Sequence, residues 1–204
     1  MTSRWQDVSP GGEAFAEKFA KLAASGADVH GEATFVERLA APGARILDAG
    51  CGTGRVAIRL SQQGFHVDGV DVDLSMLSVA QREAPSLTWV RADLSALGPD
   101  VPGPYDIIIA AGNVLPLLAA GTEATAIAAL SARLAPNGLL VVGFGLDSAH
   151  LPLESAPFGL IGYDAWCAEA GLTLRNRYSS WDGDPFDEDD DDDSRGYAVS
   201  VHSR

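Results

Sequence analysis

Three glycines at alternate positions, Gly50, Gly52 and Gly54, follow a short apolar run that ends near Asp48. Glycine allows a sharp turn and leaves no side chain between the backbone and a ligand. Such a turn at the start of a helix also presents backbone N–H groups and the positive end of the helix. The pattern predicts a site for a nucleotide-like molecule. Its spacing differs from the G-x-G-x-x-G of dinucleotide sites, which disfavours a nicotinamide cofactor.

Two further aspartates stand where the next two predicted strands end. Asp71 ends the second strand, where a carboxylate can accept hydrogen bonds from both hydroxyls of a ribose. Asp93 ends the third strand, where it can accept from the amino group of an adenine, with Val72 and Leu94 on either side of the ring. A single aspartate is often a helix cap or a turn former. Three aspartates in register behind one glycine turn favour a nucleoside site.

Candidate groups for proton transfer follow the fourth and fifth predicted strands. His150 and Asp147 lie after the fifth strand, Asn113 follows the fourth, and His30 lies before the first. A general base is needed only when the nucleophile arrives protonated. We therefore treat His150, Asn113 and His30 as candidate catalytic residues. His202, on the last strand, is expected to be structural.

Aromatic side chains could form walls of the site, because cationic groups and amines favour aromatic faces. Trp5, Phe144 and Trp181 are the candidates. Phe15 and Phe19 are instead expected to be core residues.

Short apolar runs alternate with longer amphipathic ones from Ala44 onward, which is typical of βαβ units on a parallel sheet. We expect strands at 45–49, 66–71, 87–91, 105–111 and 139–144, and helices at 55–63, 73–83, 122–134 and 163–170. Ligands of such sheets bind beyond the carboxyl ends of the strands. The candidate residues are therefore expected to meet at one edge of the sheet.

The two ends of the chain complete the predicted fold. Two polar-alternating runs, 172–181 and 196–202, pair most simply as an edge hairpin with one antiparallel strand. Two helices, 13–24 and 32–39, precede the sheet and either pack against it or cover its ligand site. The predicted class is α/β, with a Rossmann-like seven-stranded, mostly parallel sheet, an antiparallel last strand, helices on both faces and an N-terminal helical lid.

The composition predicts one globular domain. The chain has 204 residues, of which 47% are hydrophobic, enough for one core, so we expect a cap at 1–41 and an α/β core at 44–204. No run approaches the roughly 18 apolar residues of a membrane helix, and the start lacks a signal-like run. A cytoplasmic protein is expected. The two cysteines have no metal-ligand spacing, so no metal is expected.

The net charge of −14 comes largely from one segment, because residues 182–193 contain nine acidic residues and no basic one, and the remainder carries −5. Binding to a phosphate backbone would oppose this charge, so nucleic acid is not an expected partner. The run lacks the glycine and spaced ligands of a calcium loop. We expect 182–195 to be a solvated, mobile hairpin tip.

The motifs, taken together, resemble those of a known family. The order of the segments 48–54, 69–72 with Met76-Leu77, 92–94 and 134–138 is similar to that of class I S-adenosylmethionine-dependent methyltransferases. The resemblance covers about 44–145 and implies S-adenosylmethionine as cofactor. It implies cofactor contacts from Asp48, Gly50, Cys51, Gly52, Gly54, Asp71, Val72, Met76, Asp93, Leu94 and Ala111.

Three functional hypotheses remain open. The first is an enzyme that methylates an N, O or C atom of a small molecule, because Gly112-Asn113 resembles the corresponding segment of enzymes such as glycine N-methyltransferase and lacks an Asn-Pro-Pro-Tyr signature. The second is a non-catalytic module that binds S-adenosylmethionine and acts through a partner. An NAD-linked dehydrogenase is third. A monomer or weak homodimer is expected.

Overall fold

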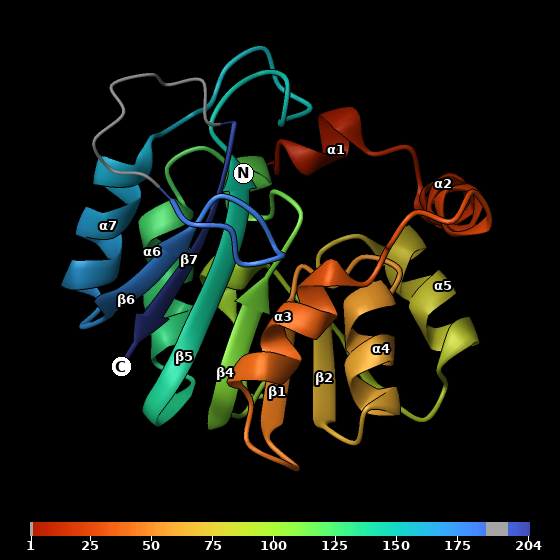
Figure 1. The fold of residues 1–204 in the computed structure, drawn as a ribbon, viewed down its shortest axis with the longest axis horizontal. Coiled ribbons are helices and arrows are strands. Elements are labelled where there is room, and N and C mark those ends of the chain that lie inside the picture. The colour runs from red at the N-terminus through yellow and green to blue at the C-terminus, as the bar shows by residue number, and fades with distance from the viewer. Residues whose placement is uncertain (1, 187–195) are drawn as a thin grey trace.

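A mixed sheet crosses the protein in the computed structural model, which describes residues 2–186 and 196–204 (Figure 1). Within these residues the strands are β1 (Arg45–Ala49), β2 (His66–Asp71), β3 (Thr88–Arg91), β4 (Tyr105–Ala110), β5 (Leu134–Gly145), β6 (Thr173–Tyr178) and β7 (Tyr197–Ser203). Their order in the sheet is β3-β2-β1-β4-β5-β7-β6. Within the described residues, β7 runs antiparallel to both of its neighbours, β5 and β6, and the other neighbouring pairs are parallel. The Rossmann-like fold with a reversed last strand is confirmed.

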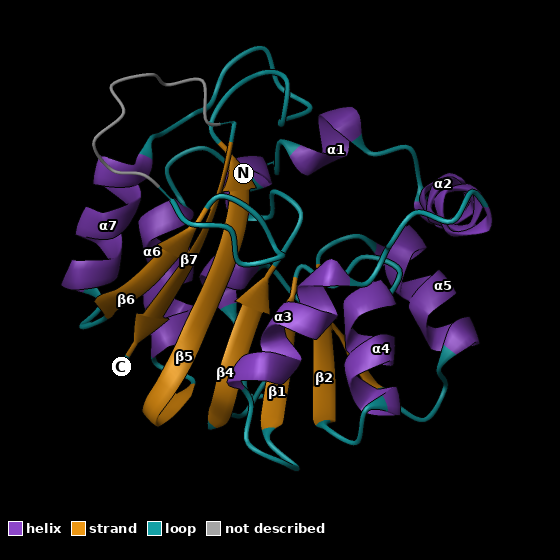
Figure 2. Cartoon of the chain, in the orientation of Figure 1, coloured by secondary structure: helices purple, strands orange, loops and turns teal. Residues whose placement is uncertain are grey.

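Helices cover both faces of the sheet (Figure 2). In the described chain they are α1 (Trp5–Val8), α2 (Gly12–Ala24), α3 (Gly31–Leu39), α4 (Arg55–Gln62), α5 (Leu74–Glu83), α6 (Glu123–Ser131) and α7 (Leu160–Glu169), with 3-10 turns η1 (Leu94–Ala96) and η2 (Leu115–Leu117). The helix expected at 122–134 ends at Ser131, because Leu134 already pairs with Tyr105 as the first residue of β5. The short helix α1 has no counterpart in the sequence prediction.

Alternate residues of the central strands enter two separate cores. Ile108 of β4 packs in the core beneath α6 and α7, whereas Ile107 and Ile109 pack in the core beneath α3 and α4. This follows from the period of two along a strand. A strand with both faces covered is almost entirely apolar, as 105–111 is apart from Asp106, which explains why this run was recognisable as a central strand.

Trp89 of β3 fills a space that two glycines leave open. A Cβ atom on Gly54 would lie 2.6 Å from the Trp89 ring, and one on Gly69 would lie 2.4 Å from it. The indole N–H donates to the carbonyl of Ala84 at 2.9 Å, which holds the ring in place. Gly54, the third glycine of the loop, therefore allows the start of α4 to pack closely against Trp89 of the sheet.

Residues 187–195, which include seven of the nine acidic residues of this segment, lie outside the described residues, so the expected mobile tip at 182–195 stays a prediction there. Among the described residues, no helix combines the length and the apolar character needed to cross a bilayer.

Substituting Gly54 by alanine is expected to destabilise the fold through this contact. Gly54 has φ +82°, and the added Cβ must also displace Trp89, so we expect a loss of about 2–4 kcal/mol in the free energy of unfolding. Gly64→Ala is the matched control, since Gly64 has φ +94° but open space around it, and should cost about 1–2 kcal/mol. Urea unfolding measures both, and equal losses would contradict the role of Trp89.

Candidate active site

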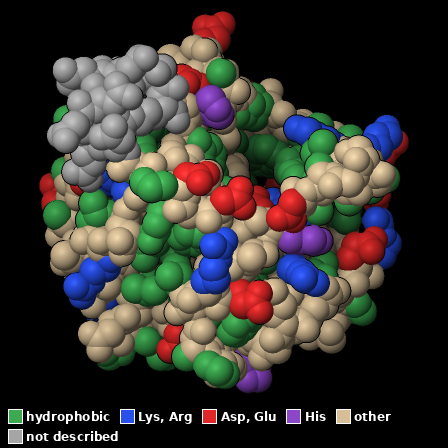
Figure 3. Space-filling view, viewed as in Figure 1, with side chains coloured by type: hydrophobic (Ala, Val, Ile, Leu, Met, Phe, Trp, Pro, Cys, Tyr) green, Lys and Arg blue, Asp and Glu red, His purple; other side chains and the backbone are tan. Residues whose placement is uncertain are grey.

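A cavity of about 640 Å³ opens beyond the carboxyl ends of β1 to β5. Its walls come from the N-terminal segment and from the loops that follow these five strands. Figure 3 shows a hollow at the upper part of the molecule with largely hydrophobic side chains around it. Ligands of open α/β sheets bind in this place. The structure thus brings the predicted ligand-binding residues of several strands to one edge of the sheet.

The backbone of the glycine loop is bonded within the protein. The N–H groups of Gly50 and Cys51 both donate to the carbonyl of Val70, at 2.7 and 3.0 Å. That of Gly52 donates to Asp71 Oδ2 at 2.8 Å. The expectation that this loop offers free N–H groups to a ligand is therefore wrong for these residues. A Cβ on Gly50 would lie 2.5 Å from the Val114 side chain, so glycine here permits a tight turn against the loop after β4.

Asp48 lies at the floor of the cavity and is 2% exposed. Its Oδ2 accepts from the N–H of Ala57 at 3.0 Å, in the first turn of α4. Burial raises the pKa of this carboxyl to about 7, against the opposing effect of that hydrogen bond and of Arg55. A buried carboxylate beside a cavity favours a cationic ligand.

Asp71 is buried at the end of β2. Its Oδ2 accepts from Gly52, and its Oδ1 accepts from the N–H of Asp73 at 2.8 Å. Burial raises the pKa of the carboxyl, and the two backbone donors oppose this shift. An ionised carboxylate has about four acceptor positions, so positions remain for a ligand that carries two adjacent hydroxyls.

Asp93 lies on the cavity wall after β3. Its Oδ1 accepts from the N–H of Ser95 at 2.8 Å and from the Ser95 hydroxyl at 2.7 Å, so it caps η1. No hydrogen bond from the described residues reaches Oδ2. Asp93 therefore combines the capping role common for such residues with a free oxygen at the cavity.

Arg55 carries a cation into the cavity wall. Its guanidinium forms a bidentate ion pair with Glu32 at 2.7 and 2.5 Å and lies 4.4 Å over the ring of Phe19. Burial works against the charge, but the bonds to Glu32 outweigh it and raise the pKa of Arg55. Neither Arg55 nor Glu32 is among the residues predicted from the sequence, although the position of Arg55 directly after the glycine loop was a usable signal.

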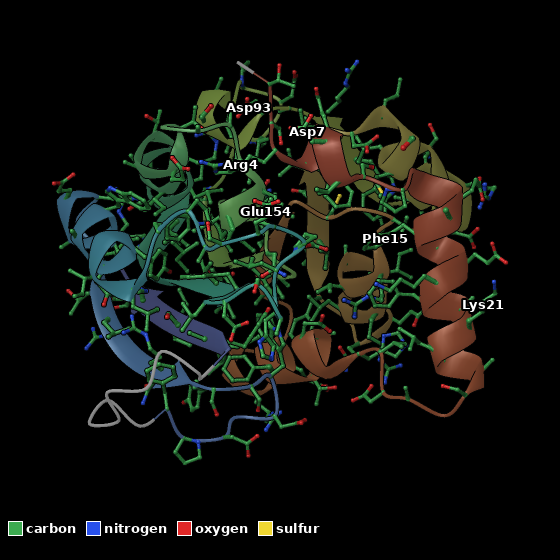
Figure 4. The ribbon with its side chains drawn as sticks, turned by 90° about the horizontal axis from the view of Figure 1, so that it is seen from above. Arg4, Asp7, Phe15, Lys21, Asp93 and Glu154 are labelled. Carbon is green, nitrogen blue, oxygen red and sulfur yellow. The ribbon has the colours of Figure 1, made fainter. Side chains whose placement is uncertain are left out.

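The N-terminal segment closes one side of the cavity. The indole N–H of Trp5 donates to Asp73 Oδ2 at 2.9 Å, and Trp5 packs edge-on against Phe15. Phe15 projects inward from α2, whereas Lys21 lies on its outer side (Figure 4). Trp5, Phe15 and Phe19 all line the cavity. The assignment of Phe15 and Phe19 to the core is therefore wrong, because the apolar face of α2 is turned toward the cavity.

The prediction that Phe144 and Trp181 form walls of the site is wrong. Phe144 is fully buried in the core beneath α7, where it packs against Tyr163. Trp181 packs against Phe35 and donates to the Tyr197 hydroxyl at 3.1 Å. Neither side chain lines the cavity within the described residues. Phe144 points away because the alternation along β5 places it on the face covered by α7.

The candidate catalytic residues fall in different places. His150 and Asn113 line the cavity. His30 is the residue before α3 and does not line the cavity in the described part of the chain; its Nδ1 is buried without a hydrogen-bond partner there. His202 is buried beside Asp164 and the Tyr163 hydroxyl, as expected of a structural histidine.

All but one of the residues expected to contact the cofactor line the cavity. These are Asp48, Gly50, Cys51, Gly52, Asp71, Val72, Met76, Asp93, Leu94 and Ala111. Gly54 does not line it within the described residues, because its position against Trp89 places it behind the loop. Among the described residues, no cluster of three or more His, Cys, Asp or Glu side chains could hold a metal ion.

Comparison with known proteins identifies the family. A family model described as a methyltransferase domain matches residues 46–138. The solved structure of a TehB-like S-adenosylmethionine-dependent methyltransferase from Corynebacterium glutamicum is 33% identical, with a TM-score of 0.83 over 95% of this chain and 97% of that one. The chain belongs to the class I S-adenosylmethionine-dependent methyltransferases. This confirms the predicted family and its cofactor, S-adenosylmethionine.

Curated relatives of this methyltransferase differ in the atom that receives the methyl group. A glycine/sarcosine N-methyltransferase of Halorhodospira halochloris is 33% identical over 57% of this chain and 49% of its own length. A ubiquinone biosynthesis O-methyltransferase of Nitrosococcus oceani is 27% identical over 66% of this chain and 65% of its own length. The chain thus spans less than two thirds of the length of these relatives.

The buried carboxyl of Asp48 should make stability depend on pH. Its pKa of about 7 exceeds the unfolded value near 3.8, so the folded protein binds the extra proton between these values and loses stability as pH rises through them. Asp48→Asn removes this charge. We expect the stability of the variant relative to the wild type to rise between pH 5 and 8, by about 1.4 kcal/mol for each pH unit between 5 and the pKa of about 7.

Urea unfolding at pH 5 and at pH 8 measures the difference in stability between Asp48→Asn and the wild type. Asp100→Asn, at an exposed position, is the control and should show no such gain. If the free energy of unfolding of Asp48→Asn differs from that of the wild type by the same amount at pH 5 and at pH 8, burial does not disfavour the Asp48 charge.

Proposed function

We propose that this methyltransferase transfers the methyl group of S-adenosylmethionine to a small molecule. The observation that supports this best is the placement of Asp48, Asp71 and Asp93 at the ends of three neighbouring strands, around one cavity. A volume of about 640 Å³ lies within the range of about 300–1,000 Å³ that holds small-molecule ligands. The glycine/sarcosine N-methyltransferase among the relatives is named for small acceptors, in agreement with this class.

The residues present fit the parts of this cofactor. The remaining acceptor positions of Asp71 suit the two ribose hydroxyls, and Asp93 Oδ2 suits the adenine amino group. Val72 and Leu94 line the cavity beside these aspartates and would cover the adenine ring. Asp48, with the turn through Gly50, Cys51 and Gly52, would hold the cationic methionine end.

Alignment is the main contribution that these residues make to the reaction. When bound, S-adenosylmethionine supplies a methyl group on a sulfonium that is primed for displacement. Holding the two reactants in line and excluding water accounts for much of the acceleration of such a transfer. The N-terminal segment contributes by covering the cavity through Trp5 and Phe15.

Binding of S-adenosylhomocysteine tests the proposed cofactor site. We expect calorimetry to show binding to the wild type and a loss of about 100-fold or more in Asp71→Ala, since two charge-assisted hydrogen bonds to the ribose are removed. His66→Gln is the control, because His66 is exposed at the opposite end of β2, and it should bind like the wild type. Binding that survives Asp71→Ala would contradict the ribose role.

Turnover separates an enzyme from a module that only binds the cofactor. Methyl-labelled S-adenosylmethionine, incubated with phenols, amines and carboxylates, should yield labelled product with at least one class. A protein that binds S-adenosylhomocysteine but labels no acceptor would favour the non-catalytic module.

A further inference from the structure

The cavity wall is unevenly charged. The acidic residues Glu32, Asp48, Asp71 and Asp93 come from α3 and from the ends of the first three strands, and Lys18 and Arg55 come from α2 and α4. The wall that follows β4 and β5 is apolar, with Val114, Leu117, Leu118, Ala119, Ala149, Leu151 and Pro152. Its polar side chains, within the described residues, are Asn113 and His150. An ionic acceptor on this side would lose its hydration without gaining an opposite charge.

Asn113 is occupied in holding two loops together. Its Oδ1 accepts from the N–H of Gly145 at 2.7 Å, and its Nδ2 donates to the carbonyl of His150 at 2.8 Å. The residue also has φ 71°, a left-handed conformation that asparagine tolerates better than most residues. Asn113 therefore fixes the position of His150, and these two bonds use one N–H and one oxygen lone pair of its amide.

The imidazole of His150 is oriented by a carboxylate. Nδ1 lies 2.8 Å from Asp147 Oδ1, which also accepts from the N–H groups of Ala149 and His150 at 2.9 and 3.0 Å. The hydrogen bond from His150 is the main cause that lowers the pKa of Asp147. A carboxylate at Nδ1 favours the tautomer with its proton on Nδ1, so Nε2 keeps a lone pair.

The His150 ring packs against the backbone just before β7 and is partly exposed. The ring lies against the backbone of Gly196, where a Cβ atom would come within 2.0 Å of it. Glu154 follows on the same loop and is exposed. The His150 side chain is 48% exposed, so its ring has access to solvent while the residue lines the cavity. A proton taken up at Nε2 can leave to water.

We propose that His150 is the general base of this methyltransferase, positioned by Asp147 and Asn113, and that the acceptor is a neutral, largely apolar molecule with a hydroxyl nucleophile, such as a phenol. This rests on the proposed function. A hydroxyl needs a base, unlike an acceptor that arrives ionised. The apolar wall after β4 and β5 suits the rest of such a molecule.

The proposed reaction is an in-line displacement at the methyl carbon, coupled to loss of the hydroxyl proton. The hydroxyl oxygen of the acceptor forms a bond to the methyl carbon as the carbon–sulfur bond breaks, and the electron pair of that bond goes to sulfur. The hydroxyl proton moves to Nε2 of His150, which becomes an imidazolium and then releases the proton to solvent. The products are a methyl ether and S-adenosylhomocysteine.

Methylation of phenol and 4-nitrophenol at pH 8 tests the proposal, because 4-nitrophenol is already largely ionised at this pH. We expect wild-type turnover of both, with a higher KM for the ionised 4-nitrophenol, because the apolar wall disfavours its charge. In His150→Gln we expect kcat for phenol to fall about 10²- to 10⁴-fold and kcat for 4-nitrophenol to fall far less. His66→Gln is the matched control and should turn over both phenols like the wild type.

The tautomer of His150 gives a readout that needs no acceptor. Nitrogen NMR of the imidazole should show the neutral ring protonated at Nδ1 in the wild type and a loss of this preference in Asp147→Asn. A neutral ring protonated at Nε2 in the wild type would overturn the proposal.

Binding of S-adenosylhomocysteine, measured together with phenol methylation, distinguishes a failure of this inference from a failure of the proposed function. S-adenosylhomocysteine binding in His150→Gln should match the wild type. A wild-type protein that binds S-adenosylhomocysteine but methylates no phenol, or methylates only amines or carboxylates, overturns the inference alone. Equal losses for phenol and 4-nitrophenol in His150→Gln also overturn it. Absence of S-adenosylhomocysteine binding to the wild type contradicts the proposed function itself.

Discussion

The buried carboxylate of Asp71 connects the parts of the protein that make the cavity. Through Gly52 it holds the glycine loop, and through the N–H of Asp73 it holds the turn that begins α5. Asp73 in turn accepts from Trp5 and Ser9, which brings the N-terminal segment over the strand ends. One side chain at the end of β2 thus determines where the loop after β1 and the covering segment lie relative to each other.

This arrangement places two buried carboxyls, Asp48 and Asp71, at one end of the sheet. Burial raises the pKa of both carboxyls. The Asp71 charge also raises the pKa of Asp48, and both charges add to the effect of burial in raising the pKa of the Cys51 thiol. An isolated buried charge is unfavourable unless it is paired. In the proposed complex, the positive charge of the methionine end would offset the buried charge of Asp48, and the ribose hydroxyls would donate to Asp71. The proposed role of these carboxyls thus accounts for a cost in stability to the free protein.

The two halves of the cavity differ because different elements build them. The half beside β1, β2 and β3 is built from strand ends with acidic side chains, so its chemistry follows from local sequence motifs. The half beside β4 and β5 is built from the loops that Asn113 joins, whereas the apolar face of α2, with Phe15 and Phe19, covers the cavity beside α4 and α5. Those contacts connect segments far apart in the sequence, so the acceptor side is a property of the assembled fold.

The sequence by itself determined the family, the cofactor, the order of helices and strands and most bounds of the first strands. It could do so because glycine turns, the Asp73 cap and the alternation along β4 act over a few residues. Tertiary structure decided which apolar faces meet the cavity: it turned Phe15 toward it and Phe144 away, and left His30 and Gly54 outside. The periodicity of a helix identifies an apolar face but not what that face packs against, since this depends on residues brought together only when the chain folds.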